Sequence, residues 1–325
     1  MPPLKNPNVL PFTNCSDEQS RPVKLLLIDG HYYAYRSFFA IRGLSNAKGE
    51  PTNAIYGFLK TVRRMLKDLR PDSGAIFWDK GLPAHRVALQ PEYKQQRAEM
   101  PEDMKPQLSF IQNITTLMGF PSIALPDTEA DDLIGCYATH ASALGHEVII
   151  ATNDKDLFQL TGLPGVSVYS TNKTDLASPS DTFALLGPDA VRGKWGVEPA
   201  QIADVLALTG DTADNIPGVQ GFGPKTAAGL IREHGSILNL LENLSAVQNE
   251  KYREKLAAAK DQILQNLAMV RLDLNIPLPQ ALDSMQIQPQ PRELLDALAP
   301  CDFKGIMEEI RSELKPAMLE QSELF

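Results

Sequence analysis

Three aspartates of this chain come at the end of short apolar segments. Asp29, Asp79 and Asp154 end or closely follow residues 23–28, 75–78 and 147–151. Each segment is β-prone and apolar throughout, which is typical of a strand buried on both faces. The carboxyl ends of parallel strands meet at one edge of a sheet, and ligands bind there. Turn formation alone explains one such aspartate, but three in succession favour a shared site.

Further acidic residues occur in small groups along the chain. They are Glu129, Asp131 and Asp132; Asp154 and Asp156; and Asp211 and Asp214. The first group opens a predicted helix, whose first turn favours acids in any case. The second group lies on one side of the chain if that stretch is extended. The third lies on one face if helical, although its Gly-, Asn- and Pro-rich surroundings also fit a simple turn.

These nine carboxylates cannot all ionise unaided if they converge, because neighbouring like charges force protonation. Mg²⁺ and Mn²⁺ prefer carboxylate oxygen and water as ligands. Two such ions about 4 Å apart can clamp a phosphodiester and activate a water for in-line attack. The net charge of −9 alone argues against nucleic acid as a partner. Setting the nine acids aside leaves 31, equal to the 31 Lys and Arg, so the acidity does not exclude DNA.

The chain divides into two regions of different pattern. Strand-like and helix-like segments alternate in residues 23–186, with helices expected at 54–69 and 104–118, which predicts a mainly parallel α/β sheet. Helical patterns dominate residues 187–300. We expect helices at 188–195, 199–208, 224–234, 236–244 and 248–270.

The two ends of the chain differ from the regions between them. Residues 1–22 are Pro-rich and predict a disordered tail, not a secretion signal. Residues 301–325 predict a C-terminal helix and then a tail after Pro316. No apolar run reaches the roughly 18 residues of a membrane span. The three cysteines are sparse and fit a reducing cytosol.

Residues 80–106 form an unusually long connection for a compact domain. The segment carries Arg86, Tyr93, Lys94, Arg97 and Lys105 among several prolines and few large aliphatic residues. A connection of this length is usually either functional or disordered.

Several motifs in order resemble the 5′-nuclease domain of bacterial DNA polymerase I, and more broadly the flap endonuclease family. The motifs are Asp29-Gly30-His31, Glu129-Ala130-Asp131-Asp132, Asp154-Lys155-Asp156-Leu157, and Thr209-Gly210-Asp211 through Asp214-Asn215-Ile216-Pro217-Gly218. The resemblance covers residues 23 to about 300. It implies a PIN-like α/β core, with residues 80–106 as a helical arch, followed by a helical DNA-binding domain.

The resemblance also implies roles for the acidic residues, and this sequence has an acid at all nine of the family's acidic positions. Asp29, Asp79, Glu129 and Asp131 would bind a first metal ion; Asp154, Asp156 and Asp211 a second; and Asp132 and Asp214 would lie nearby or act through water. Mg²⁺ or Mn²⁺ is the implied cofactor.

Basic and aromatic residues acquire roles through the same resemblance. Arg86 would face the scissile phosphate and Lys94 is a second candidate, with a solvated arch surface as the alternative for both. Tyr35 would stack on a terminal base, although a core aromatic residue on a helix is nearly as good an explanation. Tyr93 and Arg97 complete the DNA contacts expected from the arch.

A glycine-rich turn follows the last acidic group and resembles the family's helix–three-turn–helix. Its predicted DNA-binding residues are Gly218, Gly221, Gly223, Lys225 and Thr226. Glycines allow close approach of a phosphate, and a helix beginning near Pro224 points free N–H groups at it. The resemblance implies a K⁺ ion on the loop carbonyls.

The sequence therefore predicts a cytoplasmic, nucleoid-associated and monomeric nuclease for DNA with 5′ flaps, nicks or free 5′ ends, including primer RNA. Whether exonuclease or endonuclease activity dominates stays open. Two alternatives are an RNA-cutting PIN-type nuclease and a non-catalytic junction-binding protein. The apparent arch and helix–three-turn–helix disfavour the first, and the full acid set disfavours the second.

The last residues of the chain carry a separate hypothesis. Gln321, Leu324 and Phe325 fit the Gln-x-x-Leu-Phe pattern with which bacterial replication and repair proteins dock on the sliding clamp. A disordered tail could present these apolar side chains to a hydrophobic groove. The alternative is a frayed helix end whose Leu and Phe pack back onto the core.

Overall fold

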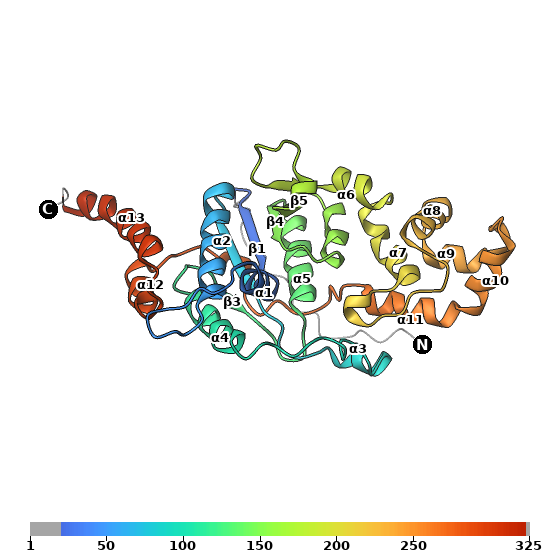
Figure 1. The fold of residues 1–325 in the computed structure, drawn as a ribbon. Helices are drawn as coiled ribbons and strands as arrows, with labels where there is room; N and C mark the ends of the chain where they lie inside the picture. The colour runs from blue at the N-terminus through green and yellow to red at the C-terminus, as the bar shows by residue number, and fades with distance from the viewer. Residues whose placement is uncertain (1–20, 323–325) are drawn as a thin grey trace, which may run out of the picture.

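A six-stranded sheet forms the centre of the structure, a computed structural model that describes residues 21–322 and, for residues 315–322, the backbone alone (Figure 1). The strands are β1 Lys24–Asp29, β2 Ser73–Phe77, β3 Ser122–Ile123, β4 Glu147–Ala151, β5 Val166–Ser170 and β6 Ala184–Leu186. Their order is β3-β2-β1-β4-β5-β6, parallel except for the β5–β6 pair. The strand order reverses beside β1, which is the position where open α/β sheets bind ligands.

Alternating side chains of the strands pack against helices on both faces of the sheet. Leu26 and Ile28 face one cluster, covered by α1 Gly30–Ala40, α2 Asn53–Leu69 and α4 Met104–Thr115. Leu25 and Leu27 face the other cluster, covered by α5 Ala130–Ala143. This three-layer arrangement confirms the predicted, mainly parallel α/β core.

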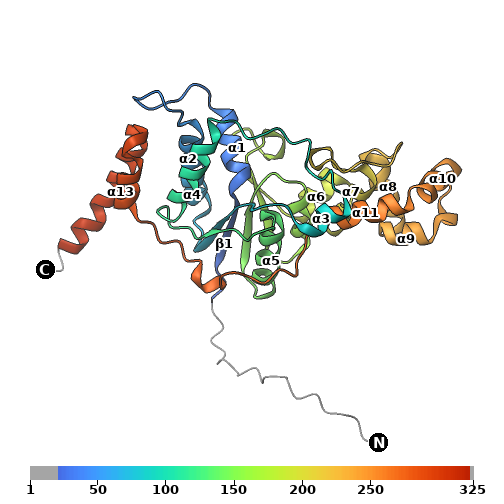
Figure 2. The same ribbon diagram turned by 90° about the horizontal axis from the view of Figure 1, so that it is seen from below.

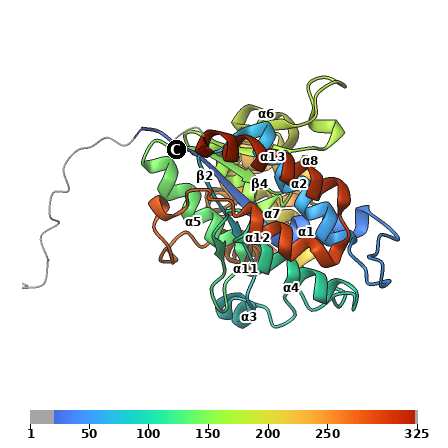
Figure 3. The ribbon, with the colours of Figure 1, turned by 90° about the vertical axis from the view of Figure 1, so that its left-hand side faces the viewer.

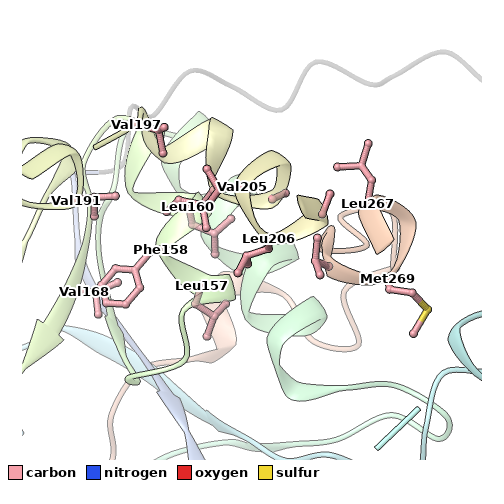
Figure 4. Close-up of a cluster of buried hydrophobic side chains, with 14 of the residues drawn as sticks. Leu157, Phe158, Leu160, Val168, Val191, Val197, Val205, Leu206, Leu267 and Met269 are labelled. Atoms are coloured by element: carbon pink, nitrogen blue, oxygen red, sulfur yellow. The ribbon is translucent and has the colours of Figure 1, made fainter. Parts of the chain in front are cut away.

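A second, helical region follows β6 and extends to the right in Figure 1. Its helices are α6 Pro188–Trp195, α7 Ile202–Thr209, α8 Pro224–His234, α9 Ile237–Glu242, α10 Glu250–Ala258 and α11 Lys260–Val270. The predicted helix 248–270 is thus two helices, because the chain leaves helical geometry at Ala259 (φ −99°, ψ 11°). Leu157 and Phe158 pack in one continuous cluster with Val205 and Leu206 of α7 (Figure 4).

Short 3-10 helices connect many of these elements. They are η1 Asp156–Gly162, η2 Lys173–Asp175, η3 Pro199–Gln201, η4 Thr212–Asp214, η5 Leu244–Ala246, η6 Leu282–Ser284 and η7 Ala299–Cys301. In the arch segment the structure has one six-residue helix, α3 Ala84–Leu89, which lies close to α11 in Figure 2.

After α11 the chain returns to the sheet domain. The Gly74 N–H donates to the Met285 carbonyl at 2.8 Å, and the Gln290 N–H donates to the Leu117 carbonyl at 2.9 Å. Helices α12 Pro291–Leu298 and α13 Lys304–Ser322 then lie on the α2 side of the molecule (Figure 3). Residues from about 272 to 300, which the sequence assigns to the helical domain, therefore pack on the sheet domain.

The C-terminal helix is longer than the sequence predicts. Ile306 and Ile310 of α13 are buried with Phe303 in the cluster that contains α2. The backbone of α13 continues through Pro316 to Ser322, so the tail expected directly after Pro316 is wrong for residues 317–322. Of the predicted clamp peptide, Leu324 and Phe325 lie outside the described residues, as do residues 1–20 of the predicted N-terminal tail. Across residues 21–322, we find no helix with the length and apolar character needed to span a membrane.

Candidate active site

Asp29 occupies the junction between β1 and α1. It ends the strand and caps the helix, because its Oδ1 accepts the Tyr32 N–H at 2.9 Å. The Thr152 hydroxyl, just after β4, donates to Oδ2 at 3.1 Å. Gly30 is required next, since a Cβ there would lie 2.6 Å from the Trp78 ring. The carboxylate is thus fixed at the carboxyl edge of the sheet, and no cationic side chain pairs with it among residues 21–314.

Asp79 and Asp131 come from neighbouring elements at the same edge. Asp79 follows β2, and its Oδ1 accepts the Ala130 N–H at 2.8 Å, which ties it to the first turn of α5. Its own N–H donates to His31 Nδ1 at 3.1 Å. Asp131 lies one residue further along that first turn. Asp154, which follows β4, lines the same cleft as Asp29, Asp79 and Asp131, so the predicted convergence of acids from three strand ends is present in the structure.

The pKa values of these acids show the electrostatic cost of bringing them together. Burial, followed by the nearby Asp79 and Asp154, raises the pKa of Asp29 to about 7, although its bond from the Tyr32 N–H opposes the rise. Burial and the charges of Asp154, Asp29 and Asp79 raise the pKa of Asp131 well above its ordinary value. Like charges in a low-dielectric site favour protonation unless a cation neutralises them. The group has the electrostatics of a cation site.

A second acidic group lies between η1 and the loop after α7. Asp156, Asp211 and Asp214 offer carboxylate oxygens that all lie within 4.8 Å of one another. Burial, then the charges of Asp154 and the two other acids, raise the pKa of Asp156 well above its ordinary value. One Asp156 oxygen is buried without any hydrogen-bond partner among the described residues. Lys155 supplies one cation, 2.6 Å from Asp211.

Two glycines position this loop against the end of α7. Gly210 has φ +71°, in the left-handed region that favours glycine, and a Cβ there would lie 2.3 Å from the Gly218 nitrogen. A Cβ on Gly218 would in turn lie 2.2 Å from the Thr209 carbonyl oxygen. The backbone of residues 209–210 is thus in close contact with that of residues 216–218. Asp211 follows directly, and its Oδ1 accepts the Ala213 N–H at 3.0 Å. Larger residues at these two positions would displace the acid.

The arch segment docks on the acids through its basic and aromatic residues. Lys94 pairs with Glu129 and lies 3.6 Å from Asp214, and Arg97 lies 2.6 Å from Asp214. The Tyr93 hydroxyl donates toward Glu129 at 3.0 Å. Tyr93 is 3% exposed, so the DNA contact expected of it is not available in this conformation.

Arg86 departs most clearly from its expected position. Its side chain is 4% exposed and makes two 2.8 Å bonds to the Asp132 carboxylate, a further bond to Glu129, and a 3.0 Å bond to the Arg271 carbonyl. Asp132 also accepts the Asp273 N–H at 2.9 Å. In this conformation Arg86 therefore faces the protein interior and does not line the cleft, and the Asp132 oxygens are bonded to Arg86.

A cleft of about 410 Å³ lies at the carboxyl edge of the sheet, beside the first acidic group. Its lining includes Asp29, Asp79, Asp131 and Asp154, together with Lys94, Arg97, Tyr35 and His31. Sequence reasoning missed His31, Thr152 and Lys155. Their only signal is adjacency to the acidic motifs, since His31 directly follows Asp29-Gly30 and Lys155 lies between two motif aspartates.

The predicted DNA-binding turn has the expected local form. Helix α8 begins at Pro224, with Gly223 as an N-cap that offers no side chain, and Lys225 is exposed in the first turn. N–H groups at such a helix start favour anions. Lys255 of α10 donates to the Gln220 carbonyl of the same turn at 3.1 Å.

The chain matches two family models in succession. Residues 24–196 match the 5′-3′ exonuclease N-terminal resolvase-like domain, and residues 197–293 match the 5′-3′ exonuclease C-terminal SAM fold. It is 35% identical over 287 residues to a 5′-3′ exonuclease of Aquifex aeolicus, covering 88% of this chain and 94% of that one.

Larger relatives match over part of their length. The thermostable DNA polymerase I of Thermus thermophilus is 37% identical over 300 residues, covering 92% of this chain and 34% of the polymerase. The chain thus spans about a third of such relatives. Among solved structures, the bacteriophage T5 5′-exonuclease with bound zinc has a TM-score of 0.63 at 22% identity, covering 91% of this chain and 98% of that one. The catalytic core of Rad2 with a DNA substrate has a TM-score of 0.55 at 17% identity, covering 86% and 88%.

Proposed function

Because this chain belongs to the 5′-3′ exonuclease family, we propose that it is a metal-dependent nuclease that hydrolyses DNA phosphodiesters at free 5′ ends, nicks and 5′ flaps. The observation that carries the proposal is the convergence of Asp29, Asp79, Asp131 and Asp154 around one cleft that also contains Lys94 and Arg97. The second acidic group lies near Asp154, whose charge adds to burial in raising the pKa of Asp156. The T5 flap endonuclease, described in complex with DNA and metal ions, shares the fold. We assign the same reaction to primer RNA, with 5′-phosphate and 3′-hydroxyl products, in replication and repair.

The donor set fits divalent cations, with Mg²⁺ or Mn²⁺ preferred by all-oxygen ligands. Asp156, Asp211 and Asp214 would hold one ion, and the unpartnered Asp156 oxygen supports this assignment. Asp29, Asp79, Asp131 and Asp154 would hold a second ion, because burial and the charges of neighbouring aspartates raise the pKa of Asp29, Asp131 and Asp154. Bound ions of this kind supply positive charge to the phosphate and lower the pKa of a coordinated water.

The side chains of this protein orient the phosphate and limit where it can sit. Lys94 and Arg97 line the cleft, so they are the cations that would meet a phosphodiester there. Both now pair with acids of the site, and a phosphate would exchange for those carboxylates as their partner. Tyr35 lines the same cleft and is half-buried, so part of its ring is accessible for stacking with a terminal base.

The helical domain would hold the duplex arm that contains the cut strand. Gly218, Gly221 and Gly223 keep the turn before α8 free of side chains, and Lys225 and Thr226 follow in the first helical turn. Backbone phosphates bound in this way position a duplex without reading its sequence. A K⁺ ion on these carbonyls would have to coexist with the Lys255 ammonium, which already contacts Gln220.

The function is tested with a labelled 5′-flap duplex incubated with and without Mg²⁺. We expect cleavage only with metal, at or near the junction of flap and duplex. Absence of cleavage with Mg²⁺ and with Mn²⁺ would refute the assignment as a nuclease.

The C-terminal peptide adds a proposed partner. We assign Gln321, Leu324 and Phe325 to binding of the bacterial sliding clamp, which would raise the local concentration of a monomeric, nucleoid-associated cytoplasmic enzyme at nicks. Deletion of residues 321–325 should abolish clamp binding and leave flap cleavage unchanged. If the variant that lacks residues 321–325 binds the clamp as well as the full-length protein does, these residues do not form the clamp-binding site.

A further inference from the structure

His31 accepts a backbone hydrogen bond at a point where the sheet has no carbonyl to offer. Just after β2, the Trp78 N–H donates to the Ile123 carbonyl of β3 at 2.9 Å. Successive N–H groups of an extended chain point to alternate sides, so the Asp79 N–H faces β1. Strand β1 has already ended at Asp29, and the Asp79 N–H donates instead to His31 Nδ1 at 3.1 Å. The imidazole thus replaces a strand carbonyl at this edge of the sheet.

The ring of His31 is held in position by Trp78. The two rings meet edge to face, with 5.4 Å between their centroids and an interplanar angle of 84°. Trp78 is buried, and its Nε1–H donates to the Ser122 hydroxyl at 2.9 Å. Gly30 lets the start of α1 approach this indole, because a Cβ there would lie 2.6 Å from it. His31 Nδ1 is therefore fixed next to the Asp79 N–H.

The bond from Asp79 determines which nitrogen of His31 carries the proton. An N–H donor requires a lone pair on Nδ1, so the neutral ring is protonated on Nε2. Asp79 Oδ2 lies 3.5 Å from the same Nδ1, which is long for a hydrogen bond, and a proton on Nδ1 would face the Asp79 N–H. His31 therefore acts as an acceptor and not as the cation of an ion pair.

The contacts of Asp79 leave one of its carboxylate oxygens for a ligand. Oδ1 accepts the Ala130 N–H at 2.8 Å, so one oxygen is tied to α5 while the backbone is tied to α1 through His31. The Asp79 side chain is 39% exposed and lines the cleft with Asp29 and Asp131. Two bonds, to two different helices, thus set the direction of Oδ2.

We propose that His31 is a positioning residue, which holds the backbone of Asp79 through Nδ1 so that Oδ2 completes the ion site of the cleft. The inference rests on the proposed metal-dependent nuclease function and adds the residue that sets the geometry of one ligand. His31 does not bind the ion itself, because Nδ1 accepts the Asp79 N–H and Nε2 carries a hydrogen. Groups that hold a metal ligand in place typically contribute about 10- to 100-fold to metal affinity.

The test titrates Mn²⁺ into the protein without DNA and follows free Mn²⁺ by electron paramagnetic resonance. The parent is compared with His31→Ala, His31→Asn and His31→Gln. Asn places an oxygen acceptor where His has Nδ1, whereas Gln places an amide where His has Nε2. Asp131→Ala identifies the binding step that belongs to the cleft. His140→Ala, which changes an exposed histidine near the end of α5, is the matched control.

His31→Ala and His31→Gln should weaken the step that Asp131→Ala removes by about 10- to 100-fold, and they should leave the other Mn²⁺ step unchanged. His31→Asn should restore the parental affinity, because only the acceptor at Nδ1 has to be replaced. His140→Ala should match the parent in both steps. If His31→Ala does not fold, the comparison of His31→Asn with His31→Gln gives the same answer.

Parental Mn²⁺ binding by His31→Ala would overturn the proposal, even with a lower unfolding temperature in EDTA, because a ring that only packs would affect folding and not the ion. Failure of His31→Asn to restore the affinity would overturn it as well, and rescue by His31→Gln instead would place the function on Nε2. A parent that binds no Mn²⁺ would refute both the inference and the ion sites. Since no DNA is present, a parent that binds both ions but never cuts a flap would refute only the nuclease function.

Discussion

Substitution of Arg86 tests whether the arch segment is held by a buried ion cluster, formed by Arg86, Glu129 and Asp132. Arg86→Ala would leave the carboxylates of Glu129 and Asp132 buried without their guanidinium, at 3% and 1% residual exposure. Breaking a buried ion pair by removing one partner typically costs about 3–5 kcal/mol. That is a large part of the roughly 5–15 kcal/mol by which native proteins are stable. We therefore expect a strongly lowered denaturant midpoint.

The matched control is Arg192, which also bridges two carboxylates, Asp189 and Glu198, but on the surface. Its side chain is 44% exposed, against 4% for Arg86. Exposed ion pairs contribute about 0–1 kcal/mol, so Arg192→Ala should unfold almost like the parent. Urea unfolding at low salt, followed by circular dichroism, measures both variants.

The pH dependence of the stability lost in Arg86→Ala provides a second test of the buried ion cluster. Burial raises the pKa of Asp132, and the bonds from Arg86 oppose the rise. Without Arg86 the folded-state pKa rises further, so the folded state binds a proton more readily than the unfolded state. Stability of Arg86→Ala should then recover toward the parent as the pH falls through that raised pKa. Equal midpoints for Arg86→Ala and Arg192→Ala at every pH would refute the buried cluster and return Arg86 to the substrate side.

Other predictions follow from the same contacts. Asp131→Ala should abolish flap cleavage and retain DNA binding in EDTA; cleavage at the parental rate would exclude it as a ligand. The raised pKa of Asp29, about 7, means that the metal-free fold binds an extra proton and loses stability as the pH rises from about 4 to about 7. Added Mg²⁺ should therefore raise the unfolding temperature more at pH 8 than at pH 5, and an equal rise would contradict this. Lys225→Ala should flatten the salt slope of duplex binding by about one, whereas Lys304→Ala, on α13, should leave it unchanged.

The acidic site could be predicted largely because it depends on local features. A short apolar run followed by Asp is readable in sequence, and the rule that parallel strands end at one edge brings Asp29, Asp79 and Asp154 together. How the nine acids divide into two groups was harder to predict from the sequence. Asp214 joins Asp156 and Asp211 through the close backbone contact at Gly210, which depends on tertiary packing of the loop against α7.

The path of the chain beyond α11 could not be predicted for a different reason. Residues 272–290 bond to the sheet domain through isolated backbone contacts, such as that of Met285 with Gly74, and these leave no periodic pattern. Helices α12 and α13 do show apolar periodicity, but periodicity does not indicate which surface a helix covers. The sequence places this segment in the helical domain because helical patterns dominate from residue 187 to residue 300.

The arch shows how charge can override the usual reading of an amphipathic segment. In α3 the arginine is buried, while Leu82, Val87 and Leu89 in and beside the helix are 41%, 36% and 43% exposed. A pattern of this kind predicts the opposite orientation, with the aliphatic side chains inward. The reversal follows from Glu129 and Asp132, whose buried carboxylates require a cation more strongly than the core requires three exposed aliphatic side chains. Arg86 and Lys94 are both predicted from the sequence to face a phosphate. The structure separates them by the positions of their acidic partners: Arg86 is buried, whereas Lys94 lines the cleft.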